Sequence, residues 1–247
     1  MIGYGYDENE VIEAIAKGLD NFYKSLIDKT NNLDIKKIMK RKNPYLYRAK
    51  AMQNASDIVS SVLDAFVTSS EETIFGNCFF EPLALAASGG SKALAEGVDI
   101  MIEKKEENTI YAVAVKSGTS VFNADSKKRQ EQNFAAAAKL AKQAKARYEA
   151  IIGYGYGKKK ITGKGVPKMY QELAGQEFWA ELTGEEDFYL KIIQFMGELP
   201  EQYVDDYQRS YNNAMNLLLK QFTTEFCKDT GEIDWDKLVQ FNSGSKK

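Results

Sequence analysis

The sequence predicts an α/β (α+β) fold, with a central mixed β-sheet flanked by helices and further helices at both ends of the chain. Three observations lead to this prediction. Residues 109–116 (TIYAVAVK) are β-branched and aromatic and give the strongest strand signal in the chain. Residues 97–102 (GVDIMI) alternate like a second strand, with a charged turn at 104–108 between the two. Helical periodicity dominates residues 8–29 and most of the chain after residue 169.

The chain before the sheet is expected to be helical. Residues 8 to about 29 place apolar side chains at helical spacing. Asn43-Pro44 interrupts the pattern, because proline disfavours a helical conformation at the preceding residue. A second helix is expected from Pro44 to about Val67. Residues 68–72 predict a loop and a helix N-cap, followed by a third helix over roughly 71–87 that Pro82 bends.

The chain after the second strand predicts one more strand and several helices. Asn123 or Ser126 is expected to cap a long helix that reaches about Arg147, and residues 148–156 (YEAIIGYGY) predict a strand. Helices are expected at 169–183, 186–197 and 201–228. We expect a single domain over residues 1–247, with a helical part at 1–70, a sheet-bearing core at 71–165 and a second helical part at 166–247.

The composition excludes several kinds of active site. The 247 residues contain no histidine, which rules out Ser-His-Asp and Cys-His nucleophiles and histidine-based zinc sites. The two cysteines are expected to be reduced, buried thiols of a cytoplasmic protein. No apolar run approaches the roughly 20 residues that span a bilayer, and the N-terminus lacks the features of a signal peptide. Catalysis is therefore expected to use carboxylates, lysine, tyrosine and a hard metal ion.

The charge of the chain is unevenly distributed. The net charge is only -2, but residues 116–164 hold twelve basic and three acidic residues, which gives this segment +9. The remaining 21 basic and 32 acidic residues leave the rest of the chain at -11. A basic segment in an otherwise acidic protein fits a surface for a polyanion. A solvated, lysine-rich helix explains the charge equally well.

Asp99 and Lys116 are the central candidates for an active site. Antiparallel pairing across a short turn can bring Asp99, near the start of the first strand, beside Lys116, at the end of the second. A carboxylate there can hold a divalent metal, which takes oxygen ligands. The lysine can orient or deprotonate an attacking water and stabilise charge that develops on a phosphate. Each residue alone is more often structural, so the prediction depends on their combination.

Six segments carry a resemblance to a known family: NPYLYRAK at 43–50, SSEETIFGNCFFEPLA at 69–84, GVD at 97–99, AVKSG at 114–118, GYGYGK at 153–158 and GQEFW at 175–179. In their order and spacing they resemble the PD-(D/E)XK nuclease superfamily, and more closely the PmeII-like type II restriction endonucleases. The resemblance covers roughly residues 43–180. It implies a restriction-endonuclease-like core and Mg²⁺-dependent hydrolysis of DNA phosphodiester bonds, giving double-strand breaks at a short specific site. It also implies a homodimer on double-stranded DNA and a companion DNA methyltransferase in a restriction–modification system.

One position departs from the superfamily pattern, which places Asp or Glu two residues before the lysine. This chain has Ala114 there, so either the site is inactive or another carboxylate binds the metal. Relocation of the acid to a nearby helix occurs in the superfamily. Glu72 and Glu81 are candidates on the third predicted helix, where nine residues turn the chain by about 900° and place them on opposite sides. Glu131 on the following helix is the third candidate.

Glu81 is the preferred replacement for the missing acid. It lies in the more apolar half of its predicted helix, where a carboxylate is costly unless it is paired or bound to metal. Glu72 lies in the first predicted turn, where the helix dipole explains an acidic residue without any catalytic role.

The helix after the second strand carries a further candidate and several basic residues. Gln130 and Phe134 have the spacing of a Gln-X-X-X-Tyr element seen in some relatives, and Gln130 could hold the attacking water or a phosphate oxygen. A surface glutamine is an equally good explanation. Base readout would need side chains in a groove of the DNA, for which the candidates are Arg48, Asn123 and residues 158–168. Phosphate contacts are expected from Lys127, Lys128, Arg129, Lys158, Lys159 and Lys160.

Three other functions fit the same residues. A repair or recombination nuclease would use the same chemistry but recognise DNA structure. A nuclease fold that lost its acid at Ala114 would only bind DNA. A helical protein without a nucleic-acid role is disfavoured by the +9 segment. The C-terminal helices, with Tyr203, Tyr207 and Tyr211, could supply a dimer interface or be simple core.

Overall fold

The computed structural model describes residues 1–159 and 169–244, and the chain divides into two compact units. The first unit comprises Met1–Asn21 and Phe75–Pro200, and the second comprises Phe22–Ile74 and Glu201–Lys247. Each unit is therefore built from two separate segments of sequence. The expectation of a single domain with three consecutive parts stays a prediction. Within the described ranges, no helix is both long and apolar enough to cross a membrane.

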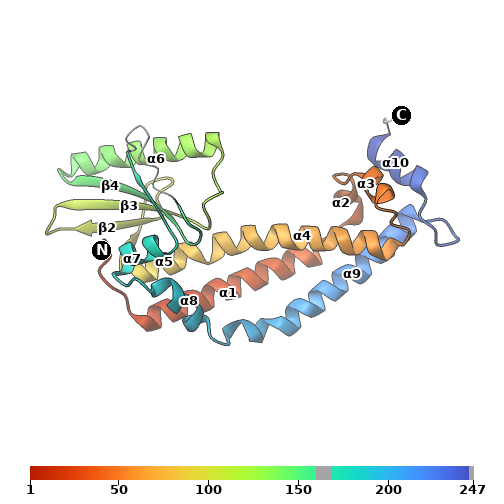
Figure 1. The fold of residues 1–247 in the computed structure, drawn as a ribbon, viewed down its shortest axis with the longest axis horizontal. Helices are drawn as coiled ribbons and strands as arrows, with labels where there is room; N and C mark the ends of the chain where they lie inside the picture. Colours follow the sequence, from red (N-terminus) through yellow and green to blue (C-terminus); the bar gives the residue numbers. More distant parts are fainter. Residues whose placement is uncertain (160–168, 245–247) are drawn as a thin grey trace. The chain divides into compact units, whose positions relative to one another are not determined.

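The first unit contains a five-stranded mixed sheet in the order β1-β2-β3-β4-β5 (Figure 1). The pairs β1–β2 and β2–β3 are antiparallel, and the pairs β3–β4 and β4–β5 are parallel. This sheet with its flanking helices confirms the predicted fold class and is consistent with a restriction-endonuclease-like core. The strands are β1 (Ser91–Lys92), β2 (Ile100–Lys104), β3 (Thr109–Lys116), β4 (Arg147–Tyr154) and β5 (Gln171–Ala174).

Helices cover both faces of this sheet (Figure 1). Helix α6 (Ala124–Gln143) packs on one face, where Phe134 and Ala137 join a buried cluster with alternate residues of β3 and β4. Asn123 and Ser126 together form a capping box at its start, so both predicted caps are used. On the other face, Gly153 and Gly155 lie against the rings of Phe178 and Phe80. These rings come from α7 (Gln176–Thr183) and α5 (Phe80–Ser88), and α8 (Phe188–Met196) follows α7.

The predicted helix over residues 169–183 is wrong in its first half. Residues 171–174 form β5, which pairs in parallel with β4, and α7 begins only at Gln176. Gly175 separates the two elements with a positive φ of 54°, a conformation that favours glycine. The short run Gln-Glu-Leu-Ala has ordinary helix formers, and pairing with a buried strand overrides that local preference.

The helices before the sheet are divided differently from the prediction. Helix α1 (Glu8–Asn31) is confirmed, but the expected helix from Pro44 to Val67 is two helices, α3 (Pro44–Ala49) and α4 (Ala55–Cys78). Ala51 between them has a positive φ of 54°. Residues 68–72 lie inside α4, and the break comes at Phe79 before α5.

Residues 68–72 were expected to form a loop because they are polar, but they are part of helix α4. Ser70 is buried, and the Thr73 hydroxyl donates to the Ser69 carbonyl, so these polar side chains are accommodated within the helix. Glu72 and Glu81 therefore lie on different helices, and the expected opposition of the two on one helix is wrong. Pro82 lies in the first turn of α5, where proline is tolerated, rather than bending a long helix.

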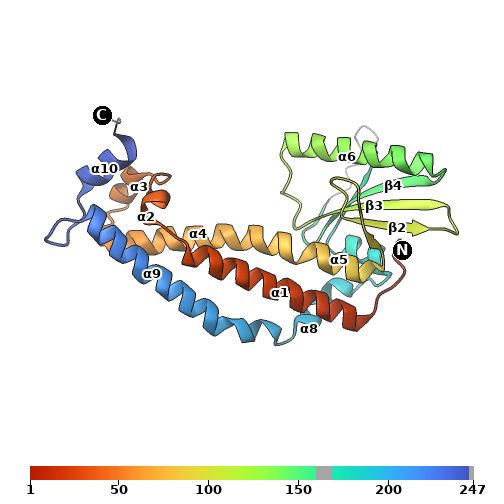
Figure 2. The ribbon, with the colours of Figure 1, turned by 180° about the vertical axis from the view of Figure 1, so that it is seen from behind.

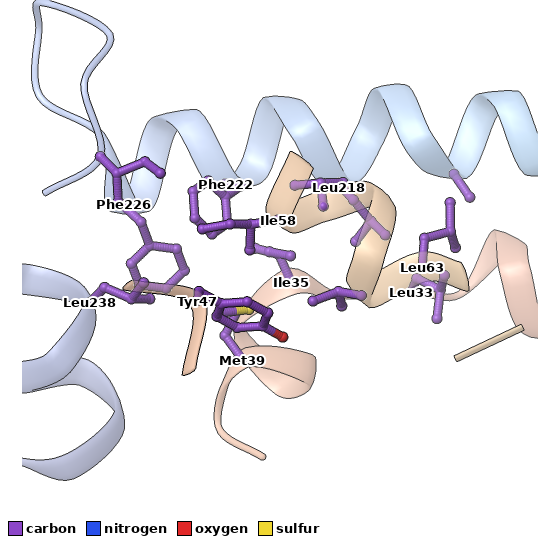
Figure 3. Close-up of a cluster of buried hydrophobic side chains, with 14 of the residues drawn as sticks. Leu33, Ile35, Met39, Tyr47, Ile58, Leu63, Leu218, Phe222, Phe226 and Leu238 are labelled. Carbon is purple, nitrogen blue, oxygen red and sulfur yellow. The ribbon is translucent and has the colours of Figure 1, made fainter. Parts of the chain in front are cut away.

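The second unit is helical. Figure 2 shows α2 (Ile35–Met39), α3 and α10 (Trp235–Ser243) gathered at one end of α9 (Val204–Phe226). Apolar side chains of these helices and of α4 form one buried cluster, which includes Phe222 and Leu218 (Figure 3). Helices α2 and α10 were not expected from the sequence.

Tyrosines at the start of α9 pack inside the second unit. The rings of Tyr23 and Tyr203 are stacked with centroids 4.6 Å apart, and the Tyr207 hydroxyl donates to Glu71 at 3.2 Å. Tyr207 and Tyr211 also pack against the buried cluster. These contacts favour the explanation that the tyrosines are core residues.

Candidate active site

Asp99 and Lys116 lie on the same two-stranded hairpin, at the end where β2 begins and β3 ends. The register pairs Ile100 with Val113, and the Asp99 N–H donates to the Val113 carbonyl at 2.9 Å. Asp99 is thereby placed across from Ala114, with Lys116 two residues further along the same face of β3. The juxtaposition expected from the sequence is present, since the Lys116 Nζ is 3.5 Å from the Asp99 Oδ2.

The Asp99 carboxylate is fixed by the backbone as well as by the lysine. Its Oδ2 accepts a hydrogen bond from the Val115 N–H of β3 at 2.6 Å, just before the first residue of β2. The Lys116 Nζ also donates to the Val115 carbonyl at 2.9 Å. Among the described residues Oδ1 has no hydrogen-bond partner, and the Asp99 side chain is 20% exposed. One oxygen is therefore held in place while the other can bind a cation.

Ala114 leaves the face of the sheet beside Asp99 without a second acid. Its side chain is fully buried and packs in the cluster beneath α6. In the described part of the chain, no group of three or more acidic or cysteine side chains is close enough to hold a metal ion. Asp99 is therefore not part of a ready-made cluster of acids in the described part of the chain, and a metal ion at this place would need further oxygen ligands.

The three candidates for the missing acid are placed differently. Glu81 on α5 is 3.6 Å from the Nζ of Lys92, a β1 residue that pairs with Ile100, the residue after Asp99. Its side chain is 38% exposed, so the argument from an unpaired, buried carboxylate is wrong. Glu72 is exposed on α4, in the segment of that helix that belongs to the second unit. Glu131 is exposed on α6 and accepts a hydrogen bond from the Tyr170 hydroxyl at 3.2 Å.

Gln130 is buried, so its explanation as a surface glutamine is wrong. Its Nε2 donates to the Gly97 carbonyl at 2.6 Å, two residues before Asp99. Gly97 has a φ of 70°, and a Cβ at this position would collide with the amide of Asn133, one turn along α6. Helix α6 therefore holds the turn that precedes Asp99, through a hydrogen bond and through a close approach that only glycine permits.

Replacing Gln130 with leucine should weaken cleavage by displacing Asp99. The substitution removes the donor to Gly97 and leaves a partly buried carbonyl unpaired, at a cost on the order of 1 kcal/mol in the free energy of unfolding. We expect cleavage to fall further than this small loss of stability explains. Gln132→Leu, at an exposed position on the same helix, is the matched control. Equal cleavage rates for the two variants, at a temperature where both are folded, would contradict a positioning role.

Several of the predicted DNA-binding cations already have partners. Lys127 and Lys159 both pair with Glu172, and Arg129 lies 2.8 Å from Glu96. Lys128 and Lys158 are exposed. Asn123 uses its side chain to cap α6, accepting from the Ser126 N–H at 2.8 Å, and Arg48 lies over the ring of Trp235 in the second unit. Lys160, and with it residues 160–168, lies outside the described residues.

Glu172 is a buried acid that sequence reasoning missed. Glu172 lies in the segment that was predicted to be helical, and a glutamate in a surface helix does not indicate a buried or functional site. As a residue of β5 it pairs with Ile152 of β4 and points to the face covered by α6, together with Tyr154. Recognition of β5 as a strand would have shown that this glutamate is on a covered face.

The mixed sheet, with an acid just before β2 and a lysine at the end of β3, is consistent with a restriction-endonuclease-like fold. The chain belongs to the family described as Type II restriction endonuclease EcoO109I, whose family model matches residues 9–202. This membership supports cleavage of DNA, in the manner of type II restriction endonucleases, as the activity. It does not separate PmeII-like enzymes from other type II enzymes. No curated protein matches the chain.

Proposed function

We propose that this chain is a Mg²⁺-dependent type II restriction endonuclease that makes double-strand breaks at a short specific site in DNA. The observation that carries the proposal is the contact between Asp99 and Lys116, 3.5 Å apart on one hairpin of the nuclease-like sheet. Membership of the EcoO109I family supports the same class of enzyme. We propose further that both units belong to one nuclease domain, and that residues 71–165 carry its catalytic core.

Asp99 and Lys116 have distinct roles in this proposal. The free Oδ1 of Asp99 is the oxygen that would bind Mg²⁺, because Oδ2 is occupied by the Val115 N–H and the lysine. The Lys116 ammonium orients the attacking water and stabilises the charge that develops on the phosphate. Its hydrogen bond to the Val115 carbonyl limits the positions that it can take. When bound, Mg²⁺ would supply Lewis-acid polarisation of the phosphate.

Glu81 is the proposed replacement for the acid that is missing at Ala114. Its partner Lys92 pairs with Ile100, and the next residue, Ala93, donates to the Asp99 carbonyl at 3.1 Å. Lys92 and Ile100 point to the face covered by α5, opposite to the Asp99 side chain, so Glu81 would have to reach the metal around the end of the hairpin. Displacement of Lys92 would free the Glu81 carboxylate, because the ion pair between the two residues is exposed and therefore weak. Glu72 and Glu131 are the alternatives, and Gln130 supports the site through Gly97.

Binding of double-stranded DNA is proposed to involve the basic residues around α6 and the end of β4. Lys128 and Lys158 are exposed and can contact phosphates directly, while Lys127, Lys159 and Arg129 would exchange a carboxylate partner for a phosphate. Lys160, Arg48 and Asn123 remain part of the proposed DNA-binding set. A homodimer would let each subunit cut one strand of a symmetric site. A companion methyltransferase would protect the host DNA.

The function is tested by incubating the protein with plasmid DNA and Mg²⁺ and sequencing the ends of the products. We expect discrete double-stranded fragments whose ends share one short sequence. Cutting restricted to branched or damaged DNA would instead identify a repair nuclease. Plasmid that stays intact at every protein concentration contradicts the proposal. The same assay on Glu81→Gln, Glu72→Gln and Glu131→Gln identifies the second acid, because the loss of a metal ligand should abolish cleavage in a variant that is folded and still binds DNA.

A further inference from the structure

Glu172 lies beneath two lysine side chains that come from different elements. Its side chain is 7% exposed, whereas those of Lys127 on α6 and Lys159 after β4 are 36% and 28% exposed. The Lys127 Nζ is 3.7 Å from the Glu172 Oε1, and the Lys159 Nζ forms an ion pair with the same oxygen. Two ammonium groups thus converge at one point on the surface, above a buried carboxylate.

Tyr154 fixes this arrangement from the side. Its hydroxyl donates to the Glu172 Oε1 at 2.9 Å and accepts from the Lys159 Nζ at 3.1 Å. Lys159 also lies 4.6 Å from the centroid of the Tyr154 ring. Burial, assisted by the Glu172 carboxylate, raises the pKa of Tyr154 above its usual value, so the hydroxyl keeps its proton. The tyrosine therefore acts only as a neutral support for the charged groups.

The lysine pair lies on the same face of the sheet as Asp99 and Lys116. Lys116 pairs with Tyr154 across β3 and β4, and Ile152 pairs with Glu172 across β4 and β5. Asp99 and Glu172 are three strands apart, which is roughly 14 Å at the usual strand spacing. This separation is too large for the two carboxylates to share a metal ion, so Glu172 is not the missing acid. It is short enough for one stretch of DNA backbone to reach both places.

The charges at this point suit an anion with several oxygens. Two partly exposed ammonium groups share a single carboxylate oxygen, which leaves a local excess of positive charge. A second carboxylate, that of Glu131, accepts a hydrogen bond from Tyr170 on the same face of the sheet. Glu131 is exposed, so solvent screens its charge. A phosphodiester presents two charged oxygens at the surface, where it can accept from both lysines at once.

We propose that Lys127 and Lys159 together bind one backbone phosphate of the DNA substrate, and that Glu172 is the counter-charge that holds the two ammonium groups in place before DNA arrives. The inference rests on the proposed function, because the phosphate is that of the nuclease's DNA. Beyond the proposed function, the inference states that Lys127 and Lys159 share one phosphate. It also states that the buried Glu172 competes with this phosphate for the two ammonium groups.

The sharing of one phosphate is tested by the salt dependence of binding to a short duplex without Mg²⁺, measured by fluorescence anisotropy. Each phosphate neutralised contributes about 0.9 to the slope of log K against log salt. We expect the double variant Lys127→Ala/Lys159→Ala to lower the slope by about 1, rather than the roughly 2 expected for two separate contacts. Lys191→Ala is the matched control, because Lys191 on α8 has the same exposure as Lys159 and pairs with Glu185, which precedes that helix.

The competing role of Glu172 is tested with Glu172→Gln, which keeps the size of the side chain and its hydrogen-bond acceptor. We expect roughly tenfold tighter binding at low salt, because a negative charge a few ångströms from the phosphate is removed. Glu185→Gln, the matched change in the control pair, should leave the affinity unchanged. A thermal melt of each variant shows whether it is folded.

Opposite results overturn the proposal. If the folded double variant keeps the wild-type slope or loses about 2, the lysines do not share a phosphate. If folded Glu172→Gln binds DNA no more tightly than the wild type, the acid does not compete with it. Plasmid cleavage by the wild type in Mg²⁺ is scored separately. If the wild type cleaves DNA but the double variant has the wild-type salt slope, only the shared-phosphate inference is wrong. If the slope changes as expected but the wild type does not cleave DNA, only the nuclease function is wrong.

Discussion

Lys116→Ala is expected to lower the rate of DNA cleavage by roughly a hundred- to a thousandfold, the usual cost of removing one group that stabilises charge in a transition state. The lysine is 3.5 Å from the Asp99 Oδ2 and hydrogen bonded to the Val115 carbonyl, so its charge is held at one place. Asp99 keeps its bond from the Val115 N–H in the variant, so the hairpin should fold. The measurement is the initial rate of plasmid cleavage at saturating Mg²⁺.

DNA binding separates a catalytic role for Lys116 from a structural one. Anisotropy with a short duplex should show nearly unchanged affinity, because one phosphate contact at most is lost. Lys105→Ala, at the exposed turn of the same hairpin, is the control and should cleave normally. Wild-type cleavage by Lys116→Ala would remove the lysine from the active site. DNA binding without cleavage in the wild type itself would identify an inactive relative.

Phe222→Ala is expected to destabilise the second unit by about 3–5 kcal/mol, which is a large part of the stability of a typical domain. Phe222 is fully buried in α9, and its ring centroid is 5.4 Å from that of Phe226. Figure 3 shows it among Ile58, Leu218 and Phe226, so its loss leaves a cavity that several elements line. Urea unfolding followed by circular dichroism measures the loss.

Leu217→Ala on the same helix is the control for this prediction. Leu217 is 42% exposed, and its truncation should change the free energy of unfolding by less than about 1 kcal/mol. Because the chain forms two units, its unfolding need not be a single transition, and the change should appear in the transition of the second unit. Similar losses for Phe222→Ala and Leu217→Ala would show that the cluster is not a tightly packed core.

The sequence predicts the central hairpin well because its signals are local. Residues 109–116 form β3 as expected, and the turn at 104–108 brings Asp99 next to Lys116. The start of α6 is similarly readable, since Asn123 and Ser126 cap it with their own side chains. The absence of an acid at position 114 is also visible in the sequence alone. Each of these features depends on residues that are close together in the chain.

The features that the sequence did not reveal depend on distant partners. β5 is a strand because it pairs with β4, and only this pairing places Glu172 beneath Lys127 and Lys159. Gln130 is buried because Gly97, thirty-three residues earlier, accepts its hydrogen bond. The continuity of α4 through Ser69 and Ser70 likewise depends on packing rather than on composition. Local propensity cannot register these contacts.

The bond between Gln130 and Gly97 ties the basic helix to the turn that carries Asp99. Lys127 and Lys128 are on the same helix, and Asn133 packs directly against Gly97, so a movement of α6 on bound DNA would reach the turn before Asp99. We expect DNA binding to be transmitted to the carboxylate in this way. One helix would then carry both the phosphate-binding lysines and the support of the metal-binding carboxylate, so a change at one of these places is expected to affect the other.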